Sequence, residues 1–525
     1  MTTVTDPKKR IIVDGVDFGS LFHFPRILRS VTAAMQPPRL VVALLMLVAL
    51  IIFGRIWDAS TNATVSPNGL LAGPMSVEQI EHAQDTMWAA LDEYGVPAGR
   101  LPARTSKLDP QTALAVLQKW YRSIREGTPL PPRAAIPGAP AIPQPDEAPL
   151  LPGTIKERDR QFLETVAQIR AVAPMDAFQA ASSQATQCFN TIIQGVMYLR
   201  PQQIFDAWRD LFVRLPVELW RQQRAFTIAF AIFFILVAAI GGGALCRMAA
   251  CAFAGQERLR VRDAFDFSFS IWVRLVLTLI LPLLIAGLLA VVLILLGLFL
   301  APWLDIVGGP LYGLAVLLGF ILAFMLIGYA VGLPMLLPAV ACENCDPVDA
   351  QQRAYFYVLN RPLHLLGYAV MALIGLALGY LIVALVAATM LNFTAALAGA
   401  LTSNSAMSGT GGFGIFDLAP GSAGEIHETW HNRWAATSVS FWQRVVIDLV
   451  AAYVVSYLFT ACTMIYLLMR RACDGQDIEE IWRPGLTPGT LVPLPRTTVH
   501  LAGEAENEAG QTPDRADATT ADDGQ

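Results

Sequence analysis

Long stretches of this sequence contain no charged side chain at all. Asp, Glu, Lys and Arg are absent from residues 275–303, 311–342 and 363–392. A helix needs about 20 apolar residues to cross a bilayer core about 30 Å thick, and about 17 is the lower limit. Because backbone polar groups inside lipid must be hydrogen-bonded within their own segment, such stretches predict transmembrane helices. The chain as a whole is only 15% charged, whereas a soluble domain carries about 25%.

These stretches, with the apolar runs around them, predict an all-α fold, that of a polytopic helical membrane protein with about six transmembrane helices. Helical periodicity between the first two spans predicts further helices, which show no coherent single core. The expected spans are residues 40–56, 226–246, 275–301, 312–337, 364–389 and 445–469, and the further helices are residues 76–94, 110–126, 155–172 and 201–220.

Composition divides the chain into parts. Residues 129–152 are rich in Pro and Ala and almost uncharged, which predicts an extended linker. The tail after Arg483 becomes Pro-rich and then acidic, which predicts disorder at its end. The expected parts are an N-terminal amphipathic segment on the membrane surface (1–37), a first transmembrane helix (38–57), an extracytoplasmic helical region with the linker (58–225), a repeat-containing transmembrane domain (226–470) with an exterior loop (393–443), and a cytoplasmic tail (471–525).

Arginines fall on alternate connecting segments, which predicts the orientation of the spans. Residues 247–274 contain five Arg, residues 343–361 contain Arg353 and Arg361, and the opposing segment 302–311 contains neither Lys nor Arg. Basic residues mark the cytoplasmic side of short loops, so both termini are expected in the cytoplasm. The chain holds 32 Arg and 5 Lys, a bias common in GC-rich bacterial genomes, so we expect a multi-pass protein of a bacterial inner (plasma) membrane.

Two of the predicted cytoplasmic segments match each other. Glu257 and Asp263 recur as Glu343 and Asp349, both at an offset of 86 residues (343 − 257 and 349 − 263). The flanking spans recur at the same offset, which predicts a parallel internal repeat of span, amphipathic interfacial helix and span. The last span, which leads into Asp474-Gly475-Gln476-Asp477, is a candidate for a truncated third copy.

The second copy carries Asp349-Ala350-Gln351-Gln352-Arg353-Ala354-Tyr355, followed by Asn360-Arg361-Pro362 at a helix entry. In this pattern, residues 226–480 resemble uncharacterised polytopic bacterial membrane proteins and the membrane domain attached to some glycerophosphodiester phosphodiesterases. The resemblance implies architecture only, because no phosphodiesterase catalytic domain is recognisable in the sequence.

Residues His427-Glu428-Thr429-Trp430-His431 fit the pattern H-E-x-x-H. Two imidazoles four residues apart share one face of a helix and can bind zinc, with the Glu as general base. A catalytic zinc normally needs a third protein ligand, and Asp448 would lie about 25 Å from His431 on a continuous helix. The sequence therefore favours an interfacial aromatic helix, with His427 and His431 as zinc ligands of a metallopeptidase in an alternative interpretation.

Several cysteines are expected near the cytoplasmic helix ends, and Cys342-Glu343-Asn344-Cys345 forms a C-x-x-C motif. Four thiolates could hold zinc or an iron–sulfur cluster, and a C-x-x-C can be redox-active. Small apolar thiols are also common packing residues, which is the favoured interpretation here. The cysteines concerned are Cys246, Cys251, Cys342, Cys345 and Cys473.

The sequence identifies no catalytic and no cofactor-binding residue, and its formal net charge of −5 comes with no basic face that would indicate nucleic acid. We expect a non-enzymatic scaffold or assembly component whose partners are membrane lipids. A permease or lipid-transport protein is the alternative, although a coupled carrier places ionisable groups at the bilayer midplane and the third to fifth spans lack them. The metallopeptidase is the second alternative, and only that interpretation requires zinc as a cofactor.

Overall fold

The computed structural model describes most of the chain between its two ends. Throughout the described part the secondary structure is helical, apart from one isolated antiparallel bridge between Val65 and Met175. The prediction of an all-α polytopic fold is confirmed, because six helices are long and apolar enough to cross a membrane. The described residues are 24–61, 65–67, 69–73, 76–96, 108, 110–126, 155–255, 259–298, 305–400, 412–416, 430–483 and 489.

Five of the six membrane helices extend at both ends beyond the apolar runs from which they were predicted, whereas α12 begins earlier than predicted and ends at Gly297, before the predicted residue 301. Three of them contain 39, 38 and 45 residues, which makes them about 58, 57 and 68 Å long at 1.5 Å per residue. Hydropathy detects only the part of a helix that suits lipid, so the polar turns at each end were missed. The helices are α3 (Pro37–Ser60), α10 (Arg224–Phe253), α12 (Trp272–Gly297), α13 (Asp305–Glu343), α15 (Pro362–Gly399) and α16 (Trp430–Asp474).

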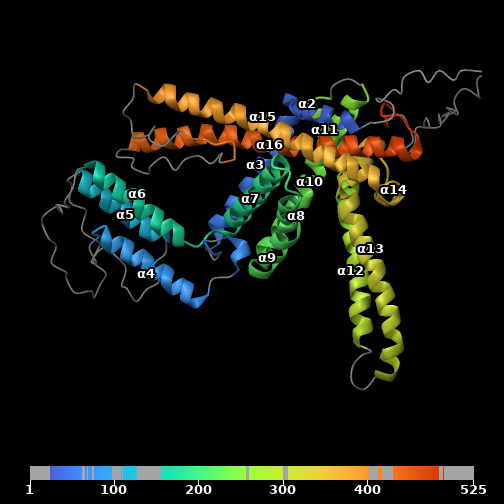
Figure 1. Ribbon diagram of the computed structural model, residues 1–525, viewed down its shortest axis with the longest axis horizontal. Coiled ribbons are helices and arrows are strands. Elements are labelled where there is room, and N and C mark those ends of the chain that lie inside the picture. The colour runs from blue at the N-terminus through green and yellow to red at the C-terminus, as the bar shows by residue number, and fades with distance from the viewer. Residues whose placement is uncertain are drawn as a thin grey trace, which may run out of the picture.

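The membrane helices are arranged as three pairs that spread from a shared end (Figure 1). In these pairs α3 packs on α10, α12 on α13, and α15 on α16. One helix of each pair, α10, α13 and α16, also packs against the other two at the shared end. Figure 1 shows the α12/α13 pair extending away from the other two pairs.

The shared end is the main core of the protein, and we call it the junction. It is formed by the uninterrupted buried runs 241–251 of α10, 335–345 at the end of α13 and just after it, and 463–470 of α16. Most of the apolar side chains of these runs belong to one hydrophobic cluster, whereas Ala244, Leu245 and Met248 of α10 belong to a second cluster, with α3. Gly242 lets α10 approach α16 closely, because a Cβ at this position would lie 2.4 Å from the ring of Phe459.

Short helices surround the junction. In the described part of the N-terminal segment, residues 24–34 pack against α15 and α16, and Ile27 and Ala34 are completely buried; the expected place of residues 1–37 on the membrane surface stays a prediction. Asp346 is at the N-cap of α14, yet its side chain makes no capping hydrogen bond and instead pairs with Arg274 at 3.6 Å. The short helices are η1 (Phe24–Leu28), α2 (Arg29–Ala34), α11 (Val261–Ser270) and α14 (Pro347–Asn360).

The region between α3 and α10 forms two helical groups. We expected no single core here, and the buried residues fall in separate clusters, one of which joins α4, α5 and α6 through Trp88, Leu117 and Phe162. α7 was not predicted, since its buried face consists largely of Ala, Cys and Ile among Ser, Gln and Thr. The helices are η2 (Leu70–Ala72), α4 (Val77–Glu93), α5 (Pro110–Glu126), α6 (Ile155–Val172), α7 (Ala177–Met197), α8 (Pro201–Arg209), η4 (Asp210–Arg214) and α9 (Leu215–Gln222).

Asp58 connects α7 to the membrane helices. Its carboxylate, near the end of α3, accepts hydrogen bonds from the backbone N–H groups of Phe178 (2.9 Å) and Gln179 (3.2 Å). Asp176 occupies the N-cap position of α7 but makes no capping bond. The cap of α7 is therefore supplied by a residue more than a hundred positions away, which satisfies N–H groups that every helix start leaves open.

Candidate functional site

Glu343 brings three elements together inside the junction. It is the last residue of α13, and its side chain is only 8% exposed. The carboxylate accepts hydrogen bonds from the hydroxyl of Tyr466 and from Nη1 of Arg470 (3.4 Å), both on α16, and it pairs with Arg353 of α14. A carboxylate is tolerated at this depth only when it is paired and hydrogen-bonded.

The guanidinium groups around Glu343 are also satisfied by backbone carbonyls. Arg470 is 1% exposed and donates from Nη2 to the carbonyls of Asp477 (2.9 Å) and Glu480 (2.5 Å). Burial by itself would lower the pKa of Arg353, but Glu343 together with Tyr466, Cys345 and Tyr357 more than offsets this and raises it. Arg353 therefore keeps its charge throughout the physiological pH range.

Arg247 is a second buried cation in the junction. From α10 it donates Nη1 to the carbonyl of Ala341 (3.0 Å) and Nη2 to the carbonyl of Trp482 (2.9 Å). Its guanidinium also lies 4.8 Å from the ring centroid of Phe267 and 5.7 Å from that of Trp482. A positive charge near the carbonyls at the end of α13 is favourable because the helix C-terminus carries a partial negative charge.

The segment after α16 folds back onto the end of α13. The backbone N–H of Trp482 donates to the carbonyl of Cys342, and that of Gly489 donates to the carbonyl of Glu343, each at 2.9 Å. These carbonyls belong to the last turn of α13, which has no intrahelical donors for them. The segment thus completes the junction instead of extending from it.

Tyr357 provides a further link, from α14 to α16. Its hydroxyl donates to the carboxylate of Asp474, and its side chain is completely buried. Burial, with the neighbouring Asp474 carboxylate, raises the pKa of Tyr357 well above its ordinary value. The phenol therefore stays protonated and remains a hydrogen-bond donor at any physiological pH.

The arrangement favours a structural role for these charges. Glu343 accepts from three donors, and the donors of Arg247 and Arg470 are directed at main-chain carbonyls. A general acid or base must reach a reacting group in an accessible cavity. The polar groups of the junction are instead used to hold α10, α13, α14 and α16 in fixed register.

The cysteines do not form a metal centre in the described part of the chain. No group of three or more His, Cys, Asp or Glu side chains with metal-binding geometry occurs among the described residues. Burial, reinforced by Glu343, raises the pKa of Cys345 to about 12, so the thiol is protonated at neutral pH. Metal binding and thiol exchange both require the thiolate. Both cysteines of the C-x-x-C motif are buried, and their packing role stays a prediction.

The H-E-x-x-H motif falls largely outside the described residues. The structure describes α16 from Trp430 onward and gives no side-chain placement for Trp430 or His431, and His427 precedes the described helix. Zinc binding by His427 and His431 therefore stays a prediction.

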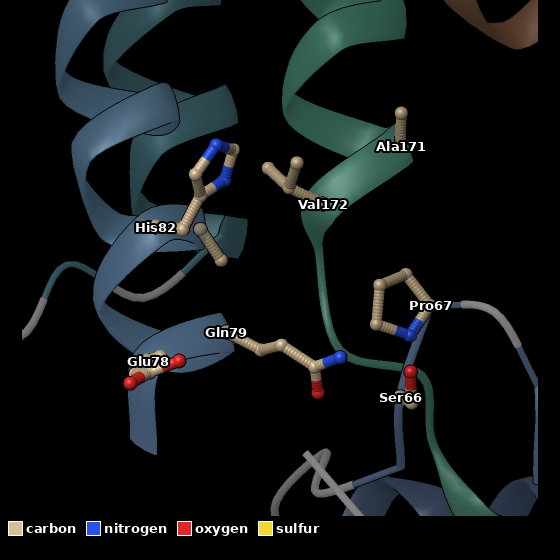
Figure 2. Close-up of a pocket in the computed structure, with 8 residues that line it drawn as sticks. Ser66, Pro67, Glu78, Gln79, His82, Ala171 and Val172 are labelled. Atoms are coloured by element: carbon tan, nitrogen blue, oxygen red, sulfur yellow. The ribbon is translucent and has the colours of Figure 1, made fainter. Parts of the chain in front are cut away.

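A shallow cavity of about 430 Å³ lies far from the junction, between α4 and the end of α6. Figure 2 shows Glu78 and His82 on successive turns of α4, with Val172 across the hollow and with the Glu78 carboxylate not directed at the imidazole. A single carboxylate and a single imidazole are too few ligands for zinc. The cavity is lined by Ser66, Pro67, Glu78, Gln79, His82, Ala83, Ala171 and Val172.

Sequence reasoning found the elements of the junction but not its chemistry. It used Glu343 to define the repeat, and it used the arginines of the connecting segments, including Arg247 and Arg353, to orient the spans. A signal was present, because Arg247 is flanked on both sides by apolar residues in α10, where an exposed Arg is not expected. The partners themselves lie up to 235 positions apart and could not be paired by pattern.

The sequence matches no family model, no curated protein and no solved structure.

Proposed function

We propose that this protein is a non-enzymatic scaffold or assembly component of a bacterial inner (plasma) membrane, with membrane lipids as its immediate partners. One observation supports this most directly. Three pairs of long apolar helices are held together at one end by a buried carboxylate and buried arginines that bond across the elements. The rigid end would fix the positions of the pairs, and the apolar surfaces beyond it would face lipid and membrane-embedded partners.

The α12/α13 pair offers the largest apolar surface of this kind. Leu288 is 65% exposed, Phe320 67% and Ile327 64%, and the most apolar window of α13 has no buried residue. The other two pairs are partly covered by α7, which packs on both α3 and α15. In a bilayer such surfaces are stable against lipid tails, and protein partners would associate there by close packing.

The positions of the arginines predict which side of the membrane each connecting segment faces. The short helices α11 and α14 and the segment after α16 surround the junction, and most of the arginines in the connecting segments lie there. We place the junction and both termini on the cytoplasmic side, and α4–α9 on the opposite side. On this basis the protein presents its rigid end to the cytoplasm.

In-cell photo-cross-linking tests the scaffold proposal. A photoreactive amino acid at Phe320 or Ile327 should give discrete protein adducts, and the adducted partner should be found in smaller assemblies in cells that lack this chain. Tyr329 is the matched control on α13, because its hydroxyl donates to the carbonyl of Leu279 on α12 and it should cross-link only within the chain. Adducts confined to lipid at both exposed positions would contradict the scaffold and favour the lipid-transport alternative.

Metal analysis separates the remaining alternative. A zinc metallopeptidase would carry stoichiometric zinc after purification in detergent and would lose it in the variant His427→Ala. The scaffold proposal expects no zinc that depends on His427. Stoichiometric zinc that is lost in this variant would overturn the proposal.

A further inference from the structure

The membrane helices contact each other in a cyclic order. If α10, α13 and α16 are taken as first spans, the helices that follow them are α11 with α12, and α14 with α15. We call α12 and α15 the second spans of the sets that begin with α10 and α13. The second span α12 packs on α13, the first span of the next set, and α15 packs in the same way on α16. The first span α16 is the last helix described, and the place of its own second span is occupied by α3, which packs on α10.

The short helices repeat the same order. α11 packs on its first span α10, α14 on α13, and α2 on α16. Each also touches the second span of the preceding set, because α14 contacts α12, α2 contacts α15, and α11 contacts α3. Each of these contacts therefore occurs three times, and in the third instance the short helix and the second span come from the N-terminal end of the chain.

The ends of the first spans share a local structure. Each is followed within two residues by a residue in the left-handed region: Gly255 (φ 67°) after α10, Asn344 (φ 54°) after α13, and Gly475 (φ 72°) after α16. Such a residue is the usual way to end a helix and redirect the chain. The sequence repeats as well, with Gly-Gln followed by an acidic residue at 255–257 and at 475–477.

An arginine lies at the start of each second span, and two of the three meet the end of the next first span. Arg39 of α3 donates to the carbonyl of Met248 on α10 (3.0 Å), and Arg274 of α12 approaches the carbonyl of Asn344 just after α13 (3.5 Å). Arg361 is at the N-cap of α15, the corresponding place in the second set. A cation at a helix C-terminus is favourable, and all three arginines lie within the first turn or at the cap of a second span.

We infer that the membrane domain consists of three equivalent units of span, interfacial helix and span, arranged around a pseudo-threefold axis. The third unit is divided between the two ends of the chain. Its first span is α16, and its interfacial helix and second span are η1/α2 and α3. The partner of the apparently truncated C-terminal copy is thus the N-terminal segment 24–61 of the same chain.

Direct contacts join the two halves of the third unit. The hydroxyl of Ser456 on α16 donates to the carbonyl of Ala34 at the end of α2 (2.9 Å), and both residues are completely buried. Arg39 of α3 also donates to the carbonyl of Ala33 on α2 (2.8 Å). The turn between α2 and α3 is therefore held by one hydrogen bond from α3 and by another from Ser456 of α16. In the first and third units the two spans also pack on each other, as α10 with α12 and α16 with α3.

Cutting the folded chain tests this closure. A site-specific protease sequence inserted after Thr61 allows the full-length protein to fold before the segment 1–61 is separated from the rest. We expect the cut segment to remain bound during size-exclusion chromatography in mild detergent. Arg39→Ala should increase the released fraction severalfold, whereas Leu45→Ala, at a 50% exposed position of the same helix, should not. Immediate release of the unsubstituted segment would overturn the inference.

Cross-linking gives a second measurement that does not depend on Arg39. The pair Ala34→Cys and Ser456→Cys should retain the cut segment on a non-reducing gel. The pair Ala34→Cys and Leu458→Cys should not, because Leu458 is 53% exposed. Equal cross-linking by both pairs would contradict the closure.

The equivalence of the units has its own test. Arg39→Ala, Arg274→Ala and Arg361→Ala should each lower the thermal unfolding midpoint of the intact chain by a few degrees. Arg262→Ala is the control, since that side chain is 90% exposed on α11. A loss confined to one of the three variants would show that the units are not equivalent.

Discussion

The carboxylate of Glu343 is enclosed by its hydrogen-bonding and ion-pair partners. Its carboxylate is buried between Arg353, Arg470 and Tyr466, and the two cations outnumber it. Neutralising it would leave buried guanidinium groups without their counter-charge, which is costlier than losing an exposed pair. The stability of the junction therefore depends on this one carboxylate more than on any surface ion pair.

We expect Glu343→Ala to destabilise the protein by about 3–5 kcal/mol, because removing one partner of a buried pair leaves the other uncompensated. Glu343→Gln keeps the shape of the side chain and should lie between Glu343→Ala and the unsubstituted protein. The measurement is the thermal or denaturant unfolding midpoint in detergent. Glu164→Gln is the control, since its pair with Arg160 is largely exposed and should contribute little. Equal midpoints for the Glu343 and Glu164 variants would show that the junction does not depend on this charge.

Cys345 predicts a dependence on pH. Its pKa of about 12 in the folded protein lies above that of an unfolded thiol, which is about 8.5. The folded state therefore holds its proton more tightly, so the contribution of Cys345 to stability is complete below about pH 8.5 and falls as the pH rises toward 12.

Alkylation by iodoacetamide at pH 8 measures this directly. In a variant whose only cysteine is Cys345, labelling should be roughly a thousandfold slower than at Val348→Cys in a cysteine-free chain, because far less thiolate is present. Val348 is 53% exposed and lies three positions away. Comparable rates at the two positions would contradict the raised pKa.

At the scale of elements, the strongest departure from expectation is α7. Its sequence is rich in Ala, Ser and Gln, so it lacks the wide apolar stripe by which α4 and α5 were recognised. The structure stabilises it from outside, through Asp58 at its N-terminus and through close packing of Phe178 on Gly54, where a Cβ would lie 2.2 Å from the ring. Local pattern cannot reveal a helix whose cap belongs to another helix.

Asp58→Ala should loosen the first turn of α7 by about 1 kcal/mol, the usual effect of losing a cap. The amides of Phe178 and Gln179 should then exchange with deuterium roughly fivefold faster, as read by hydrogen-exchange mass spectrometry. The exposed Glu81 on α4 makes a suitable control as Glu81→Ala. Unchanged exchange in the α7 peptide after loss of Asp58 would mean that packing on α3 alone holds the helix.

At the scale of the whole molecule, one helix of each pair (α10, α13 and α16) packs on the other two at the junction, while α3 also packs along α16 and α7 packs on both α3 and α15. The α12/α13 pair contacts the rest of the chain through α10, α14 and α16 near that end (Figure 1). Long exposed apolar helices would aggregate in water but are stable in lipid, where apolar side chains and acyl tails are alike. These helices therefore suit a bilayer by length and composition, and the buried ion pairs of the molecule lie at the junction, where the three pairs converge.

The proposed orientation makes a prediction that labelling of intact cells can check. A membrane-impermeant maleimide added from outside should label Val77→Cys on α4 and should not label Val348→Cys on α14 until the cells are opened. Both positions are well exposed, at 71% and 53%, so accessibility within the protein does not limit the reaction. Labelling of Val348→Cys in intact cells would reverse the orientation of the junction.

The sequence by itself determined which segments are helices that suit a membrane, because the requirement for about 20 apolar residues with internally satisfied backbone groups is local. It also indicated that two segments of the chain are alike. Only the tertiary structure decided the partners of Glu343, Arg247 and Asp58, and only it brought the N-terminal segment onto α16. These contacts join residues that are up to 422 positions apart in the chain, and they depend on complementary shape and charge. A periodic sequence pattern carries no information about such contacts.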